Sequence, residues 1–168
     1  QDHVKVLDGM FTAQAFIITD LDDNQITVFH PGAMNFSHHN QVSDADGVTL
    51  GIVSPDGREG MVQHAEQFTA AGIPFMFDPG QGLPMFDGSK LRQFMAQATW
   101  VIVNNYEWEL LKERTGWNVT DFKSNLQALI VTHGAEGSTI YTADNDYSIP
   151  VVTASTVCDP TGCGDAYR

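Results

Sequence analysis

Basic residues are scarce in this sequence. Its 8 lysines and arginines face 21 aspartates and glutamates, which gives a formal net charge of −13. No cluster of basic side chains reverses this excess locally, so neither nucleic acid nor an anionic membrane surface is expected as a partner. No apolar run approaches the ~20 residues that span a bilayer, and the first residues lack the pattern of a signal peptide. We therefore expect a cytoplasmic protein.

Cysteine is nearly absent as well. Cys158 and Cys163 lie close together around a glycine, so a structural disulfide or a zinc site is not expected and both are interpreted as free thiols.

The 168 residues, with a hydrophobic content of 42%, are sufficient for one domain with a real core.

Two β-rich runs open the chain. Residues 13–19 and 25–30 carry many β-branched and aromatic side chains, and the mostly acidic residues 20–24 between them favour a turn. These features predict a β-hairpin. The polar stretch 35–46 that follows is predicted to be a solvated loop.

From Val48 onward, short apolar runs alternate with stretches of helical periodicity. The expected strands are 48–53, 73–77, 100–103 and 128–132, and the expected helices follow a cap at 54–56, Asp87 and Asn105. This alternation predicts an α/β fold with a doubly wound, mainly parallel sheet covered on both faces. Ligands in such sheets bind beyond the carboxyl ends of the strands, where Asp78, Asn104 and Gly134 fall.

The last part of the chain is a glycine-rich stretch, 158–166 (CDPTGCGDA). Gly162 and Gly164 bracket a small residue and precede Asp165, so successive backbone N–H groups can converge on one point beside a carboxylate. A helix that begins near Gly164 would add its unpaired N–H groups. This pattern indicates an anion cradle with a base attached. The alternative is a polar loop that caps an ordinary helix.

Several motifs resemble one family. The stretch 159–165 resembles the D-T-x-G-A-G-D signature of the ribokinase-like (PfkB-type) carbohydrate and nucleoside kinases, with proline and cysteine where threonine and alanine are commoner. Asn104 and Glu107 resemble the family's N-x-x-E motif, and 132–137 resembles its T-x-G-x-x-G motif. The predicted hairpin resembles the family's small β lid. The resemblance covers nearly the whole chain and is greatest to the adenosine kinases.

The resemblance implies roles for the glycine-rich stretch. Asp165 would be the general base that accepts the proton of an acceptor hydroxyl during in-line phosphoryl transfer. Asp159 and Thr161 would hold the turn or the metal shell. The backbone N–H groups that would stabilise the developing charge are those of Gly162, Cys163 and Gly164.

The other two motifs would hold the nucleotide and its metal. Glu107 would bind Mg²⁺ through the water shell of the ion, and Asn104 would orient water or phosphate. The residues expected against the nucleotide are Thr132, Gly134 and Gly137. Each motif has a structural alternative, since N-x-x-E is also a helix cap and T-x-G-x-x-G is also a tight hairpin turn.

The resemblance therefore implies an ATP- and Mg²⁺-dependent kinase that phosphorylates a hydroxymethyl group of a nucleoside, adenosine being the expected acceptor. Phe16 and Phe29 would stack on its flat base, or else would form the buried face of the hairpin. A ribokinase- or fructokinase-like sugar kinase is the alternative within the family. A non-catalytic nucleotide- or sugar-binding module is the alternative outside it.

The family's domain plan divides the chain into residues 1–34, the lid hairpin and its connection, and 35–168, an incomplete nucleotide-binding core. The resemblance implies a fragment that lacks both ends, including an N-terminal segment that holds the sugar hydroxyls. A homodimer formed through the lid is a possible assembly.

Overall fold

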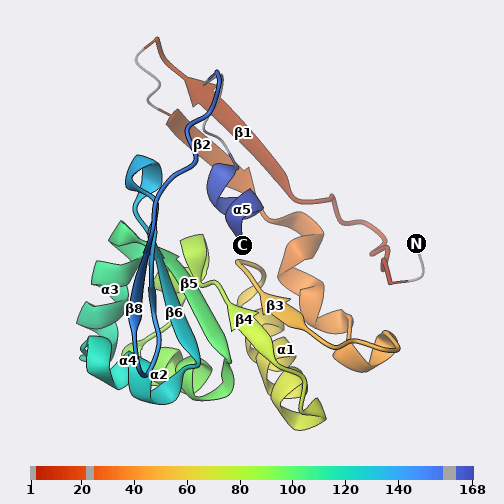
Figure 1. The fold of residues 1–168 in the computed structure, drawn as a ribbon. Coiled ribbons are helices and arrows are strands. Elements are labelled where there is room, and N and C mark those ends of the chain that lie inside the picture. Colours follow the sequence, from red (N-terminus) through yellow and green to blue (C-terminus); the bar gives the residue numbers. More distant parts are fainter. Residues whose placement is uncertain (1–2, 22–24, 157–161) are drawn as a thin grey trace.

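The computed structural model describes residues 3–21, 25–156 and 162–168. Two sheets organise it, a two-stranded hairpin and a six-stranded sheet with the order β3-β4-β5-β6-β7-β8 (Figure 1). The strands are β1 (Gln14–Thr19), β2 (Gln25–His30), β3 (Gly51–Val53), β4 (Phe75–Phe77), β5 (Trp100–Asn104), β6 (Ala128–Thr132), β7 (Ser138–Tyr141) and β8 (Asp146–Ile149). The α-helices are α1 (Arg58–Ala71), α2 (Gly88–Gln97), α3 (Asn105–Thr115), α4 (Val119–Asn125) and α5 (Cys163–Tyr167).

The large sheet is mainly parallel. Strands β3 to β6 pair in parallel, and β7 and β8 add two antiparallel strands at one edge. Because each parallel pair is joined through a helix, the carboxyl ends of β4, β5 and β6 meet at one edge of the sheet. The predicted α/β class with a mainly parallel sheet and a small separate β-hairpin is confirmed.

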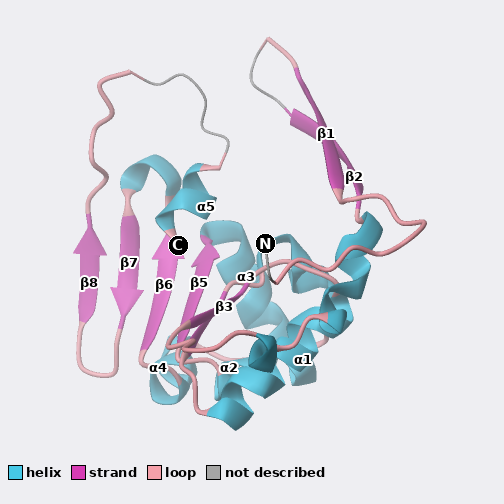
Figure 2. Cartoon of the chain, turned by 90° about the vertical axis from the view of Figure 1, so that its right-hand side faces the viewer, coloured by secondary structure: helices cyan, strands magenta, loops and turns pink. Residues whose placement is uncertain are grey.

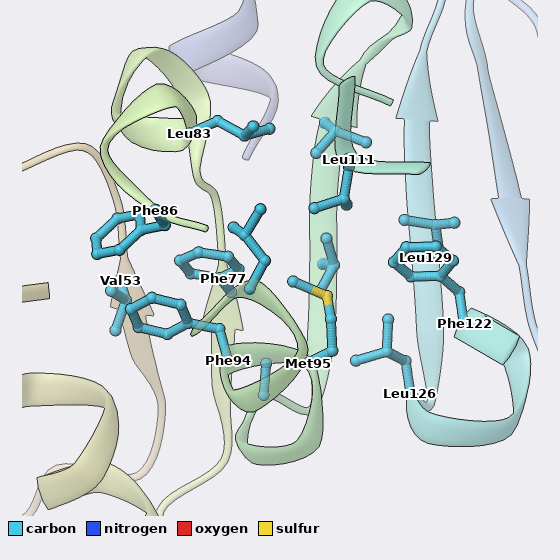
Figure 3. Packing of buried hydrophobic residues seen from close by; sticks show 14 of the residues in the cluster. Val53, Phe77, Leu83, Phe86, Phe94, Met95, Leu111, Phe122, Leu126 and Leu129 are labelled. Carbon is cyan, nitrogen blue, oxygen red and sulfur yellow. The ribbon is translucent and has the colours of Figure 1, made fainter. Parts of the chain in front are cut away.

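The hydrophobic core lies between this sheet and four helices. Alternate strand residues point to the same face, and those in the core are Val53, Phe75, Phe77, Val101, Val103, Leu129 and Val131. Figure 3 shows several of them packed against side chains from α2, α3 and α4. The rings of Phe77 and Phe94 stack with their centroids 4.4 Å apart. Burial of each large apolar side chain stabilises the fold by about 1.5–3 kcal/mol.

The described helices α1 to α4 cover one face of the sheet, whereas the sequence predicted cover on both faces (Figure 2). On the opposite face Ile52 is 49% exposed and Met76 and Ile130 are only half-buried, whereas Ile102, which lines the cavity, is buried. The alternation of strands and helices therefore predicted the parallel topology correctly but did not show on which side each helix of this chain packs.

Residues 35–46 are not the solvated loop that their polarity predicted. They belong largely to two 3₁₀ segments, Gly32–His39 and Val42–Asp44, of which the first packs against α1. Gly60 permits the contact, because a Cβ at that position would lie 2.0 Å from Ser37 Oγ. His64 Nε2 also lies 2.9 Å from the carbonyl oxygen of Asn40. The side chain of Gln41 also contacts α1, because its Oε1 accepts a hydrogen bond from Gln67 Nε2 at 2.7 Å.

Several predicted boundaries were wrong. The helix α1 has Gly57 at its N-cap without a side-chain cap, and the expected cap at 54–56 instead contributes Asp56 Oδ1, which accepts from Gly57 N–H at 2.7 Å. The first strand of the sheet begins at Gly51 instead of Val48. The helix α4 was not predicted, although Asn118 and Asp121 form a capping box at its start. No helix among the described residues is long and apolar enough to cross a bilayer.

The β1–β2 hairpin projects away from the large sheet (Figures 1 and 2). Phe16 pairs with Val28 and Phe29 pairs with Ala15 in its antiparallel register. Directly paired residues share a face and neighbours along a strand alternate, so Phe16 and Phe29 lie on opposite faces of the hairpin. Both rings are largely exposed, at 59% and 50%. Neither therefore forms a buried face among the described residues.

Candidate active site

A cavity of about 660 Å³ lies at the carboxyl ends of the central parallel strands. Its volume is within the ~300–1,000 Å³ typical of small-molecule sites. The strand ends contribute Asp78 after β4, Asn104 at the end of β5 and Thr132 at the end of β6. Phe29 approaches from the hairpin, and the other charged residues in the wall are Asp56, Glu107, Asp165 and Arg168. The cavity therefore joins segments from both sheets and from α5.

Asn104 and Glu107 occupy the junction between β5 and α3. Asn104 Oδ1 accepts a hydrogen bond from Glu107 N–H at 2.9 Å, and Glu107 Oε2 accepts one from Asn104 N–H at 2.8 Å. This reciprocal pair is a capping box that satisfies two N–H groups at the helix start. Both residues also line the cavity. The cap is therefore present, and it holds one carboxylate at the cavity wall.

The T-x-G-x-x-G stretch forms the turn between β6 and β7. Thr132 lines the cavity, whereas Gly134 and Gly137 are outside its lining. Gly137 has φ +95, and a Cβ there would lie 2.1 Å from the carbonyl oxygen of Ile149. His133 links this turn to α3 and β7, with Nδ1 2.5 Å from Asn105 Oδ1 and Nε2 2.8 Å from Thr139 Oγ1. The hairpin-turn alternative therefore accounts for Gly137.

The glycine-rich stretch ends in the short helix α5. Gly162 has φ +79 and stands at its N-cap, Cys163 is an exposed free cysteine, and both Gly164 and Asp165 line the cavity. The Asp165 side chain is 72% exposed and pairs with Arg168. The other candidates of this stretch, Asp159 and Thr161, lie outside the described residues, as does Cys158.

Asp78 is a cavity residue to which sequence reasoning assigned no role beyond its place at a strand end. It is 4% exposed and forms an ion pair with Arg168. An aspartate directly after the apolar run 73–77 was the available signal, since a charge at that point is hard to bury without a partner. Nothing in the sequence indicated a role for Arg168, because its partner Asp78 is remote in sequence.

The whole chain, residues 1–168, matches the model of the pfkB family carbohydrate kinases. The chain belongs to this family. It is 33% identical over 157 residues to a nucleoside kinase of Methanocaldococcus jannaschii, a match that covers 94% of this chain and 51% of the relative. The chain thus spans about half the length of the curated relatives it matches.

Two solved structures of a nucleoside kinase from Burkholderia thailandensis are similar to this member of the pfkB family. The complex of that enzyme with inosine is 54% identical, with a TM-score of 0.92 over 95% of this chain and 54% of the other. The complex with ADP-inosine is 53% identical, with a TM-score of 0.89 over 95% of this chain and 50% of the other.

The cavity of this pfkB family chain fits a magnesium ion that keeps most of its own water. No group of three or more His, Cys, Asp or Glu side chains is arranged as a metal cage in the described ranges. Mg²⁺ is usually held by one or two carboxylates together with waters and substrate phosphates. Glu107 lines the cavity and commits Oε2 to the helix cap, and its second carboxylate oxygen is the candidate for contact with the water shell.

Proposed function

We propose that the full-length protein transfers the γ-phosphoryl group of ATP to a hydroxymethyl group of a purine nucleoside. The observation that carries the proposal is the cavity, whose wall combines Phe29, Thr132, Glu107 and Asp165. An aromatic ring suits a base, and a carboxylate suits an acceptor hydroxyl. The similarity to an enzyme solved with inosine supports a nucleoside over a free sugar as the acceptor.

Asp165 acts as the general base. Its carboxylate takes the proton of the acceptor hydroxyl while the hydroxyl oxygen forms a bond to the γ-phosphorus. The bond between that phosphorus and the oxygen bridging it to the β-phosphate breaks, and ADP leaves with the electron pair. The backbone N–H groups of Gly162, Cys163 and Gly164 stabilise the charge on the transferred group, an effect worth about 10²–10³ in rate per donor.

The nucleotide lies along the strand ends on the other side of the cavity. Thr132 and Asn104 contact its phosphates, and the turn that contains Gly134 and Gly137 lies against its nucleoside part. Mg²⁺ supplies charge neutralisation and orientation of the phosphates, with Glu107 holding its water shell. Asp159 and Thr161 belong to the same phosphate-binding turn.

The hairpin is the lid of this site. Residues 1–34 form the lid and its connection, and 35–168 form the core. Phe29 stacks on the base, because this residue lines the cavity, whereas Phe16 lies on the opposite face of the hairpin. That opposite face also carries Ile18, Ile26 and Val28, which are all exposed. It suits pairing with the lid of a second copy, so the proposed assembly is a homodimer through this face.

The test compares kcat/KM of the full-length protein for adenosine, inosine, ribose and fructose with ATP and Mg²⁺. We expect the two purine nucleosides to exceed the free sugars by about tenfold or more, since stacking of one base is worth about 1–3 kcal/mol. A preference for ribose or fructose would replace the nucleoside proposal by the sugar-kinase alternative. If none of the four acceptors is phosphorylated, the protein is instead a non-catalytic binding module of the same fold.

A further inference from the structure

Asp78 is a buried carboxylate at the wall of an active-site cavity. It follows the core strand β4 and is 4% exposed, and it is the one charged residue among the buried residues of the described chain. A carboxylate in such a place is strongly destabilising unless a cation or several N–H groups satisfy it. The turn after it is tight, since a Cβ at Gly80 would lie 3.3 Å from Asp78 Oδ1 and 2.6 Å from the Pro55 ring.

The partner of Asp78 is Arg168, which directly follows the helix α5. Arg168 directs Nη1 to Asp78 Oδ2 and Nη2 to Asp165 Oδ1. A guanidinium is planar and offers several N–H groups in fixed directions, so one arginine can hold two carboxylates in a defined relative orientation. The helix α5 has a second contact with the sheet, where Tyr167 Oη lies 2.7 Å from Ser138 Oγ.

Asp165 needs such an anchor. Its side chain is 72% exposed, and an exposed side chain samples several rotamers unless a neighbour restricts it. Arg168 is itself only 21% exposed and is tied to a buried group, so the restriction it imposes on Asp165 is transmitted from the core. The chain of contacts runs from β4 through Asp78 and Arg168 to the carboxylate at the cavity.

The excess of negative charge in the cavity gives Arg168 a second role. Four carboxylates line it, from Asp56, Asp78, Glu107 and Asp165, against a single cation, Arg168, among the described lining residues. A triphosphate that enters this site meets like charge on most sides. The position of the guanidinium therefore also decides where positive charge is available to an incoming phosphoryl group.

We infer that Asp78 is a positioning residue which, through the guanidinium of Arg168, orients the carboxylate of Asp165 toward the acceptor. This role rests on the proposed kinase function. Asp78 does not touch the reacting atoms, and its effect passes entirely through Arg168. Loss of either member of the pair should therefore impair the transfer step and leave nucleoside binding intact.

The experiment is a double-mutant cycle in the full-length protein with Asp78→Asn, Arg168→Met and the combined variant. We expect each single change to lower kcat by about 10- to 100-fold, the usual effect of a misplaced reacting group. The Kd for inosine, measured by calorimetry without ATP, should stay within about threefold. The combined variant should be no slower than Arg168→Met, because Asp78 acts through Arg168.

Two further variants separate positioning from charge and from general stability. Arg168→Lys keeps the charge but lacks the planar fork, so kcat should remain low. Asp146→Asn breaks the exposed ion pair with Lys123, whose atoms lie 2.8 Å apart, and should leave kcat unchanged.

Two results would overturn the inference. One is an Arg168→Met variant with kcat within about twofold of the parent, which decides the matter even if Asp78→Asn fails to fold. The other is full additivity of the two losses. If the parent is active and the variants give either result, only the positioning role is rejected. If the parent phosphorylates no acceptor, the proposed function and this role are rejected together.

Discussion

Asn104 and Glu107 cap the first turn of α3 reciprocally, each side chain accepting a hydrogen bond from the backbone N–H of the other. The same glutamate lines the cavity and is the proposed magnesium-binding residue. A structural role and a proposed functional role therefore meet in one carboxylate. They can be separated experimentally, because glutamine at this position of a capping box also bonds to the N-cap N–H but carries no charge.

Replacement of Glu107 by glutamine should raise the Mg²⁺ concentration needed for half-maximal rate and leave the Tm nearly unchanged. Glu107→Ala should raise the Mg²⁺ requirement and also lower the Tm, because it removes the cap. The measurements are Mg²⁺ titrations of initial rate and thermal unfolding of the full-length variants. An unchanged Mg²⁺ titration for Glu107→Gln would show that Glu107 acts only as a structural cap of α3.

Asp165→Asn should abolish phosphoryl transfer, with a loss of kcat of about 10²-fold or more, while ATP affinity stays within a few fold. The reason is that the amide cannot accept the proton of the acceptor hydroxyl but has the same shape. Steady-state kinetics and ATP binding by calorimetry check the two parts. A variant that retains near-parental kcat would contradict the assignment of Asp165 as base.

Phe29→Ala should reduce the preference for nucleosides over ribose, by about tenfold or more in the ratio of kcat/KM values, because a stacked base loses its partner. Phe16→Ala is the matched control, since the two rings lie on opposite faces of the same hairpin and only Phe29 lines the cavity. Equal losses in both variants would show that the truncations act through the hairpin itself and that base stacking is not responsible.

The contribution of the N-cap residue Asp87 to the stability of α2 should decrease at acid pH. Lys90 N–H donates to Asp87 Oδ1 at 2.8 Å and the Ser89 hydroxyl donates at 2.7 Å, and these hydrogen bonds hold the pKa of the Asp87 carboxyl below its ordinary value. A lowered pKa contributes stability that is present above the unfolded value of about 4 and is lost as pH falls through the folded value.

The Tm advantage of the parent over Asp87→Asn should therefore be present at pH 7 and should shrink as the pH is lowered below about 4. Thermal unfolding at a series of pH values measures it. Asp87→Ala, which removes the cap in every protonation state, should be less stable than the parent at pH 7. A difference between parent and Asp87→Asn that stays constant down to pH 3 would exclude the carboxylate as its source.

The local patterns of the sequence determined a large part of this protein. Apolar runs separated by helical periodicity predicted the parallel strands, and the residues between 20 and 25 predicted the hairpin turn. Motif spacing brought Asn104, Glu107, Thr132 and Asp165 forward as candidates, and all four line one cavity. These features depend on neighbours within a few positions, so they can be recognised without knowledge of packing.

Only the tertiary structure decided which side chains meet. The hairpin register places Phe29 and Phe16 on opposite faces, and residue type alone does not reveal a register. The polar segment 35–46 folds onto α1 because Gly60 on that helix leaves space for Ser37. The ion pair of Asp78 with Arg168 joins residues remote in sequence. Such contacts arise from the packing of whole elements, and no local periodicity encodes them.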